Sequence, residues 1–308
     1  MKIEDKIFYN VASSEKLGWK PSWLGCDEFN ENLIQAIEVF QKKYNLKIDG
    51  LLGPSTYTRL ASEQQANYEL NLLSLENKYP HTLKNYITCL DKKLFLPDGH
   101  NQLIGLLHSD ALVLSDFSRP DGKRKIDLVV THWDATLSAR ACHSILEKRK
   151  ISTHFNIDND GTIYQMVDLN DIAWHAGNSK INRRSVGIDF SNAYYMKYQN
   201  YYEKKGFGSR PIMNSTIHNV KLGEHLGYYD VQLAAYKQLL KVLHLEFGLP
   251  LECPMDSKGQ LITGVYKPIL ENKFSGVCCH YHLTRNKIDC AGLDLVKLLV
   301  ETKKELGI

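Results

Sequence analysis

Apolar residues in the first sixty positions return every three or four residues, which is the spacing of one helix face. The residues on this face are Leu33, Ile37, Phe40 and Tyr44. Turn dipeptides follow at residues 49–50 (Asp-Gly) and 53–54 (Gly-Pro), and Ser55 is a suitable N-cap for a short helix that runs through Leu60. This part of the chain therefore predicts a small helical unit, best defined from about Leu17 to Leu60.

From about Leu94 onward the pattern changes to short apolar runs that alternate with amphipathic stretches. The runs at 128–130, 154–157, 162–167 and 185–190 predict strands, and an Asp-Gly turn at 160–161 joins two of them into a hairpin. Helical periodicity appears at 139–146 and at 230–245. Alternating strands and helices predict a three-layer α/β domain, with a central mixed sheet flanked by helices.

The domain organisation follows from these patterns. We expect a small N-terminal three-helix domain over residues 1–65 and a helical connector, polar in composition, over 66–93. The second domain would span 94–308, with an insertion at about 192–227.

Composition excludes several classes of protein. With 38 basic and 35 acidic residues the net charge is +3, too balanced for the strongly basic face of a nucleic-acid-binding protein. No apolar run is long enough to span a membrane, and the first residues carry acidic side chains where a signal peptide needs an apolar core. We therefore expect a protein made in the cytoplasm. Its seven scattered cysteines fit reduced thiols rather than a disulfide framework.

The N-terminal unit resembles a known family. Within Ala36–Leu60, Phe40-Gln41, Asp49-Gly50, Gly53-Pro54 and Thr56 match in order the motifs of the three-helix peptidoglycan-binding domain of bacteria. The resemblance implies a module that binds the cell wall. The alternative from the residues alone is a small helical bundle whose glycines merely end its helices.

Four segments of the second domain contain candidate catalytic residues. The first ends a buried strand with Val-Val-Thr-His at 129–132, the second contains Ser-x-His at 152–154 and Ala-Trp-His-Ala-Gly at 173–177, and the third is 185–190. The fourth joins His280 and His282 to Lys-Ile-Asp-Cys at 287–290. Hydrolysis of an amide at neutral pH needs an activated water, which a zinc ion with three protein ligands and one open position supplies.

These segments together resemble the zinc amidase family that includes phage-lysozyme-type amidases, cell-wall recycling amidases and peptidoglycan recognition proteins. The resemblance covers about residues 128–295, and the pairing of Asp-Gly-x-Ile-x-Gln with Ala-Trp-His-Ala-Gly is its most specific part. It implies N-acetylmuramoyl-L-alanine amidase activity, one Zn²⁺ ion as cofactor, and bacterial peptidoglycan as partner and substrate.

The resemblance also implies residue roles. His132, His280 and Asp289 would bind zinc, Lys287 would stabilise the oxyanion, and Asp189 would act as the general base. Asp189 stands where the family has glutamate, so its side chain is one methylene shorter, and another group could act as the base instead.

Two positions leave alternatives for the metal ligands. Cys290 occupies the usual proline position of the family and is a rival third ligand, because zinc binds thiolate readily. In an extended segment His280 and His282 would face the same side, and His280 is preferred because its distance from Lys287 and Asp289 fits the family better.

Other residues have a choice between structural and functional roles. His154 and His175 are expected to orient ligands or contact substrate, or else to be structural histidines. Trp174 either lines the substrate groove or packs in the core. The insertion is rich in tyrosine, and it would either border the groove or pack on itself.

The sequence thus predicts a monomeric peptidoglycan hydrolase, an endolysin that acts on the cell wall after release from the cytoplasm. Two rivals remain: a recognition protein that binds peptidoglycan without cutting it, and a zinc peptidase that cuts another amide of the stem peptide. The set of His132, His280, Asp289 and Lys287 favours an enzyme.

Overall fold

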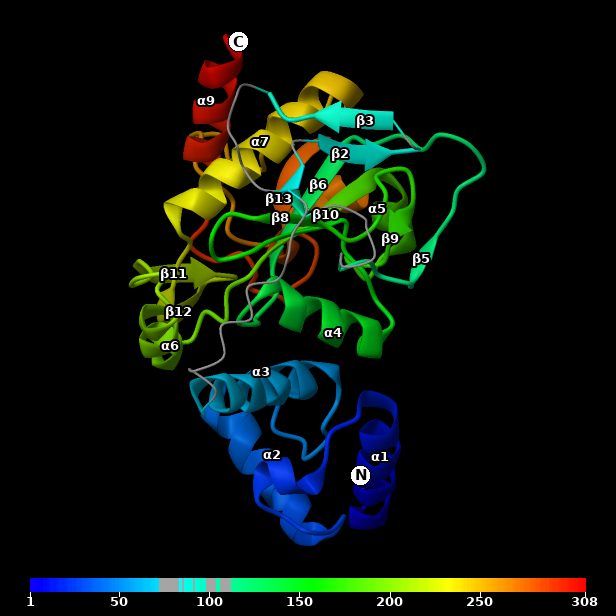
Figure 1. Cartoon of the computed structure of the whole chain (residues 1–308), viewed down its shortest axis with the longest axis vertical. Coiled ribbons are helices and arrows are strands. Elements are labelled where there is room, and N and C mark those ends of the chain that lie inside the picture. Colours follow the sequence, from blue (N-terminus) through cyan, green and yellow to red (C-terminus); the bar gives the residue numbers. More distant parts are fainter. Residues whose placement is uncertain (72–82, 85, 91, 98–103, 106–111) are drawn as a thin grey trace.

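The computed structural model describes residues 1–71, 83–84, 86–90, 92–97, 104–105 and 112–308 (Figure 1). Its N-terminal unit contains α1 (Ile3–Leu17), the 3-10 helix η1 (Pro21–Leu24), α2 (Glu31–Lys43) and α3 (Pro54–Asn71). The predicted helix face is buried, and it packs with residues of α1, η1 and α3 into a separate apolar core. Ile145 of the second domain completes this core, so the two parts of the chain are packed together.

The residues on which the resemblance of the N-terminal unit rests hold the turn between α2 and α3. The Gln41 side chain is buried, and its Oε1 accepts hydrogen bonds from the backbone nitrogens of Asp49 (2.9 Å) and Gly50 (3.0 Å). Its Nε2 donates to Asp49 Oδ1 at 2.9 Å. Gly50 has φ +68°, and a Cβ there would lie 2.7 Å from Ile34 Cγ2. In this turn, Gln41, Asp49 and Gly50 serve the fold of the unit.

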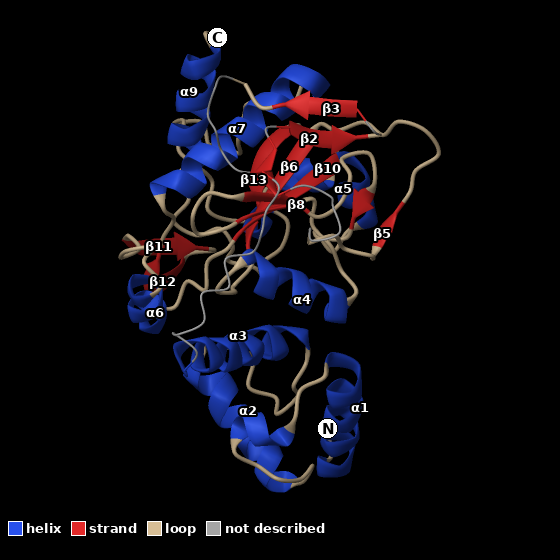
Figure 2. Cartoon of the chain, viewed as in Figure 1, coloured by secondary structure: helices blue, strands red, loops and turns tan. Residues whose placement is uncertain are grey.

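A seven-stranded mixed sheet forms the centre of the second domain (Figure 2). Its strand order is β1-β4-β8-β7-β10-β6-β13, which confirms the predicted central mixed sheet. Strands β6, β7, β10 and β13 run parallel, and β8 is antiparallel to β7. The strands of this sheet are β1 (Leu83–Lys84), β4 (Ile104–Gly105), β6 (Leu128–Trp133), β7 (Phe155–Ile157), β8 (Ile163–Gln165), β10 (Ser185–Phe190) and β13 (Gly276–Cys279).

Helices cover both faces of this sheet. Helices α7 (Asp230–Phe247) and α9 (Leu295–Leu306) share the main core with Val129 of β6. On the opposite face α5 (Ser179–Arg184) packs against Leu128 and Val130 of β6. Helix α4 (Ala139–Arg149) lies between the sheet and the N-terminal helices (Figure 1). The remaining short elements are β5 (Phe117–Ser118), β9 (Ile172–Ala173), α8 (Lys267–Leu270) and the 3-10 helix η3 (His280–His282).

The expected helical connector over 66–93 is only partly helical. Helix α3 extends to Asn71, whereas β2 (Tyr86–Cys89) and β3 (Lys92–Phe95) form an antiparallel hairpin. Ile87 and Leu94 of this hairpin are buried in the main core. The helical prediction is therefore wrong for 83–84, 86–89 and 92–93, which form strands. In the hairpin, two apolar side chains on one face outweigh the polar composition. The connector's residues 72–82, 85 and 91 lie outside the described part of the chain.

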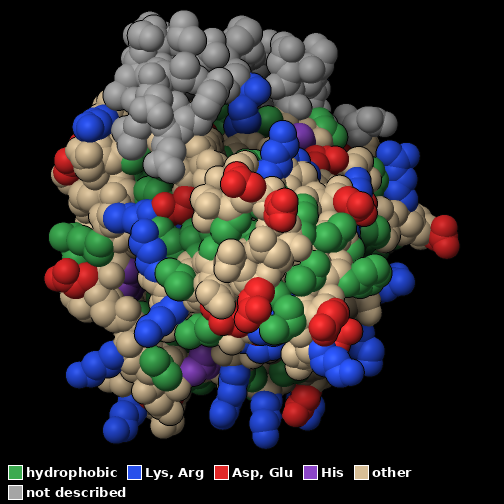
Figure 3. All heavy atoms as spheres, turned by 90° about the horizontal axis from the view of Figure 1, so that it is seen from below, with side chains coloured by type: hydrophobic (Ala, Val, Ile, Leu, Met, Phe, Trp, Pro, Cys, Tyr) green, Lys and Arg blue, Asp and Glu red, His purple; other side chains and the backbone are tan. Residues whose placement is uncertain are grey.

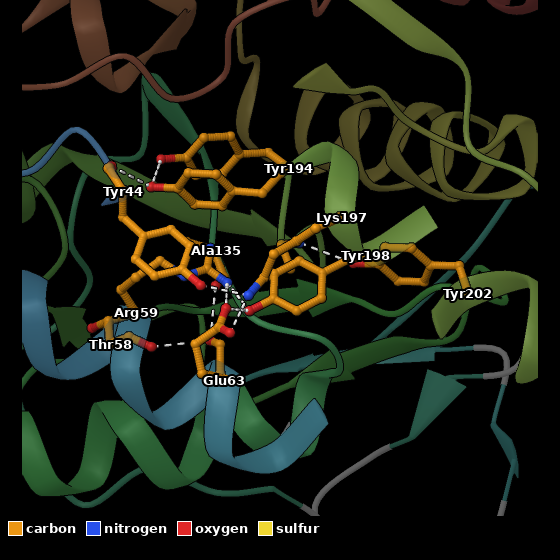
Figure 4. A network of polar contacts seen from close by, with 12 residues as sticks. Tyr44, Thr58, Arg59, Glu63, Ala135, Tyr194, Lys197, Tyr198 and Tyr202 are labelled. Atoms are coloured by element: carbon orange, nitrogen blue, oxygen red, sulfur yellow. Dashed lines mark hydrogen bonds and ion pairs between the residues drawn. The ribbon is translucent and has the colours of Figure 1, made fainter. Parts of the chain in front are cut away.

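The insertion at 192–227 packs on the N-terminal unit, an arrangement that its tyrosine content did not predict. It contains η2 (Met196–Tyr198), α6 (Gln199–Lys204), β11 (Ile212–Ile217) and β12 (Val220–Leu226). Lys197 and Tyr198 contact Glu63 of α3, and the Tyr195 hydroxyl donates to the backbone oxygen of Tyr44 at 2.9 Å (Figure 4).

The end of the molecule that carries the N-terminal helices has hydrophobic, basic and acidic side chains interspersed on its surface (Figure 3). Phe8, Val39 and Ile48 are among the exposed hydrophobic residues of this unit. Within the described ranges, none of the helices combines the length and the apolar character needed to cross a membrane.

Candidate metal centre and cleft

His132 is placed by the alternation of side chains along β6. Leu128 and Val130 pack on the α5 face of the sheet, and His132, two residues further along, faces the same way. Strand β6 lies between β10 and the edge strand β13, so His132 stands one strand in from this edge of the sheet, near the ends of three parallel strands. The imidazole is buried, with 5% of the residue exposed.

His280 and Asp289 come to His132 from the segment that follows β13. Strand β13 runs parallel to β6 and turns directly into η3, which begins with His280. His280 Nδ1 lies 3.0 Å from His132 Nδ1, and Asp289 Oδ2 lies 3.0 Å from His280 Nδ1 and 3.2 Å from His132 Nδ1. Three potential ligand atoms thus meet in a triangle from three buried side chains, a group that could hold a metal ion.

The size of this triangle fits zinc. Ligands at roughly 2.0–2.1 Å from a tetrahedral ion are about 3.3 Å apart, close to the observed 3.0–3.2 Å. Two facing imidazole nitrogens and one carboxylate oxygen also have few protons to share, so a cation between them would satisfy all three.

The protonation states suit a metal as well. Burial and the neighbouring His280 lower the pKa of His132 to about 4. Burial alone would raise the pKa of Asp289, but His280 and the close contact of the carboxylate with both histidines hold this pKa well below its usual value. At neutral pH His132 is therefore neutral and Asp289 ionised, which are the forms that bind metal ions.

His175 lies directly behind His132. Its Nδ1 is 3.1 Å from His132 Nε2, and its Nε2 is 3.1 Å from Ser185 Oγ. In this series of hydrogen bonds His132 donates from Nε2, so the lone pair on its Nδ1 is left to bind a metal ion. Gly187 makes the arrangement possible, because a Cβ at that position would lie 2.7 Å from His175 Cγ.

Asp189 and Lys287 line the same cleft as the three candidate ligands. Asp189 is paired in register with His132 on the neighbouring strand β10. Burial and the nearby Asp134 raise the pKa of the Asp189 carboxyl well above its usual value, as suits a general base. Lys287 is half-buried, and none of the described carboxylates forms an ion pair with its ammonium.

Four of the other residues considered from the sequence stay out of the cleft. The Cys290 side chain is buried in the main core against Cys279 and Tyr228, away from the two histidines that its neighbour Asp289 contacts. The ring of His154 is buried, and its Nδ1 accepts a hydrogen bond from the Gly187 nitrogen at 3.0 Å. Trp174 is 38% exposed and donates to Ser118 Oγ at 3.0 Å. The cleft lining includes none of these three residues.

His282 is the fourth of these residues. Both its ring nitrogens are bonded to the backbone: Nδ1 accepts from the Cys279 nitrogen at 2.9 Å and Nε2 donates to the Ile262 oxygen at 2.7 Å. The segment is a 3-10 helix and not extended, so His280 and His282 point in different directions. The geometry therefore separates two histidines that an extended segment would leave equivalent.

The cleft has a volume of about 250 Å³. Its second wall contains Tyr194 and Tyr195 of the insertion, in agreement with the alternative that the insertion borders the groove. Thr58 and Arg59 of α3 and Arg149 of α4 line the same wall, and no motif marks these three residues, because they come together only when the N-terminal unit packs on the second domain. Asp134, next to the His132-Trp133 pair, lines the cleft as well.

Residues 122–264 match the family model described as N-acetylmuramoyl-L-alanine amidase. The matched range is a little under half of the chain; it includes His132 and Asp189 and ends before His280, Lys287 and Asp289. Compared with curated protein sequences, the chain has no significant match.

Several solved structures are similar to this chain at low sequence identity. The amidase AmiD from E. coli, bound to anhydro-N-acetylmuramic acid-L-Ala-D-γ-Glu-L-Lys, is 15% identical with a TM-score of 0.39, over 71% of this chain and 65% of AmiD. The endolysin LysCS from Clostridium intestinale is 14% identical with a TM-score of 0.37, over 66% and 93%. AmpDh3 from Pseudomonas aeruginosa, in complex with an anhydromuramic pentapeptide, is 20% identical with a TM-score of 0.37, over 60% and 62%. The chain thus spans just under two thirds of both AmiD and AmpDh3.

Proposed function

We propose that this chain, whose residues 122–264 belong to the N-acetylmuramoyl-L-alanine amidase family, hydrolyses the amide between N-acetylmuramic acid and L-alanine in peptidoglycan with the help of one zinc ion. The observation that carries the proposal is the triangle of His132 Nδ1, His280 Nδ1 and Asp289 Oδ2, with sides of 3.0–3.2 Å. These three residues would hold the ion. When bound, it would polarise the scissile carbonyl and lower the pKa of the attacking water.

The residues around the triangle would divide the remaining chemistry. A carboxylate of Asp189 takes a proton from the water as its oxygen adds to the carbonyl carbon, and that proton passes to the alanine nitrogen as the C–N bond breaks. The Lys287 ammonium stabilises the negative charge that develops on the carbonyl oxygen. His175 keeps the His132 ring in the orientation that presents Nδ1.

The N-terminal unit is proposed to bind the cell wall and to raise the concentration of substrate near the cleft. The motif match at residues 36–60 supports this role, as do the exposed Phe8, Val39 and Ile48. A wall-binding unit joined to an amidase suits a lytic enzyme that degrades the wall after release, which is the role we propose for the whole protein.

The test is digestion of purified peptidoglycan followed by mass analysis of the products. We expect wild type to release stem peptides that begin with L-alanine, and we expect a chelator to abolish this release and added zinc to restore it. His280→Ala should reduce the release to background, whereas His143→Ala, on α4 outside the cleft, is the matched control and should act like wild type.

Two outcomes would replace the proposal. Sacculi that are bound but left intact would make the protein a recognition module. Peptides that begin at a residue other than L-alanine would make it a peptidase that cuts within the stem.

A further inference from the structure

The N-terminal unit supplies part of the wall of the candidate cleft, and this wall contains two arginines. Arg59 comes from α3 of the N-terminal unit and Arg149 from the end of α4 in the second domain. The two helices meet here, because Arg149 Nη1 donates to Thr58 Oγ1 at 3.2 Å. The cleft is continuous from this boundary to His132, His280 and Asp289.

The hydrogen-bonding capacity of Arg59 is only partly used. The residue is 3% exposed, and its Nη2 donates to Glu63 and to the Tyr198 hydroxyl (Figure 4). Its Nε and Nη1 are buried and have no hydrogen-bond partner within the described part of the chain. Buried guanidinium nitrogens almost always have partners, so two open donors in a cleft wall indicate a group that is supplied from outside.

Arg149 is the second cation of this wall. The residue is half-buried, and among the described residues no carboxylate forms an ion pair with its guanidinium. Thr58 Oγ1 is its one hydrogen-bond acceptor there. Arg184 differs from Arg149 in this respect, because its Nε donates to Asp127 Oδ1 at 2.5 Å.

We propose that Arg59 and Arg149 form a carboxylate-binding subsite across the boundary between the two parts of the chain, and that it binds a carboxylate of the stem peptide. The guanidinium fork matches a carboxylate in both shape and charge. Asp134, Asp189 and Asp289 make the end of the cleft at the candidate metal site acidic, whereas the arginine end is basic. This difference in charge would orient a peptide whose scissile amide lies at the acidic end and whose carboxylate lies at the arginines. This inference rests on the proposed amidase function for its substrate.

A stem peptide offers two carboxylates, one on its γ-linked second residue and one at its C-terminus. The test therefore uses N-acetylmuramoyl-L-Ala-D-γ-Glu-L-Lys and two forms of it, each with one of these carboxylates amidated. Steady-state kinetics are measured for wild type, Arg149→Gln and Arg149→Lys. Lys148→Gln is the matched control, since it removes an exposed charge from the preceding position of the same helix and leaves the cleft lining unchanged.

We expect Arg149→Gln to raise KM about 10-fold for the unmodified substrate, with kcat within about 2-fold, because a hydrogen bond to a charged group is lost away from the reacting atoms. Amidation of the bound carboxylate should raise the KM of wild type by a similar factor and leave that of Arg149→Gln unchanged. Arg149→Lys should recover part of the loss, and Lys148→Gln should match wild type. Arg59→Lys, in preparations that unfold like wild type, should show the same loss of discrimination.

Equal KM values of wild type for all three substrates would overturn the subsite, and so would full discrimination in Arg149→Gln. Calorimetric binding of free L-Ala-D-γ-Glu-L-Lys and its amidated forms separates this inference from the amidase proposal. A wild type that cuts nothing but binds the peptide through Arg149 and one carboxylate would refute the amidase and support the subsite. A wild type that cuts all three substrates equally well would do the reverse.

Discussion

Asp289 and Cys290 are neighbours in the chain, but their side chains enter different environments. Asp289 Oδ2 lies against His132 and His280, whereas Cys290 is buried in the main core. Burial raises the pKa of the Cys290 thiol well above its usual value, which keeps it protonated and unsuited to zinc. Of the two rival ligands, the geometry therefore favours Asp289.

The two single variants test this choice. Asp289→Asn removes the anionic ligand, and we expect it to weaken zinc binding by at least about 100-fold, since even loss of an outer contact costs about 10–100-fold. Cys290→Ala should retain one zinc per chain, with some loss of stability from the small cavity. Zinc content after dialysis against a competing chelator measures both. The opposite pattern would make Cys290 the ligand.

At the residue scale the sequence predicted the site only in part. The apolar run at 128–130 places His132 at the end of a buried strand, whereas the role of Asp189 came from the family resemblance and its pairing with His132 from the register of the folded sheet. The approach of His280 and Asp289, more than 145 residues later than His132, depends on a parallel strand and a 3-10 turn that periodicity does not encode. No sequence motif marks Arg59 or Arg149, because the two residues come together only when the N-terminal unit packs on the second domain.

At the scale of single elements, β10 leaves room for His175 because residue 187 is a glycine. Gly187→Ala would place a Cβ 2.7 Å from His175 Cγ and 2.9 Å from Thr153 Oγ1. We expect a loss of about 1–3 kcal/mol in unfolding free energy from overpacking. Displacement of His175 should also weaken zinc binding by about 10–100-fold, because His132 loses its support.

The matched control for this variant is Gly264→Ala, where the nearest atom to the added Cβ is 3.7 Å away. Denaturant unfolding and zinc titration are compared for the two variants. Wild-type zinc affinity in Gly187→Ala would show that His175 does not orient His132.

The turn between β7 and β8 predicts a pH effect on stability. Burial and the nearby Asp160 raise the pKa of Asp158 to about 7, so the folded chain binds this proton more tightly than the unfolded chain does. Protonated Asp158 therefore contributes fully to the free energy of unfolding below about pH 4, and this contribution is lost as the pH rises through about 7. Asp158→Asn should remove a decline in unfolding free energy on the order of 2–4 kcal/mol over this range.

Denaturant unfolding between pH 4 and 8 checks this prediction, with Asp121→Asn as an exposed control that should keep the wild-type slope. An identical slope in wild type and Asp158→Asn would show that Asp158 is ionised throughout the range.

Sequence patterns predicted elements well where burial is complete. The apolar runs at 128–130 and 185–190 became β6 and β10, whose side chains are all buried. The hairpin of β2 and β3 was missed because only Ile87 and Leu94 face the core, too few to stand out from a polar stretch. Helix α1 was missed too, since its exposed Phe8 blurs the helical periodicity.

At the scale of the whole molecule, Glu63 is the acidic centre of the contact between the N-terminal unit and the insertion. It accepts from Arg59 at 3.2 Å and also contacts Lys197 and Tyr198. Glu63→Ala would leave the buried Arg59 uncompensated, and we expect a loss of about 3–5 kcal/mol. We also expect unfolding to separate into two transitions, because the N-terminal unit would come loose first.

The control for this variant is Glu38→Ala, which removes a partly exposed ion pair with Lys6 of 2.9 Å inside the N-terminal unit and should cost less than about 1 kcal/mol. Scanning calorimetry distinguishes one transition from two. A single transition at the wild-type temperature in Glu63→Ala would mean that this contact does not hold the two parts together.

The contact through Arg59 has a consequence for protein engineering. Modular lytic enzymes invite the exchange of one binding module for another to redirect them to new bacteria. Here a chimaera that replaces the first 71 residues would lose Thr58 and Arg59 from the cleft and would leave Lys197 and Tyr198 without Glu63. A successful graft would have to carry α3 along with the catalytic part, and place the new module before residue 54.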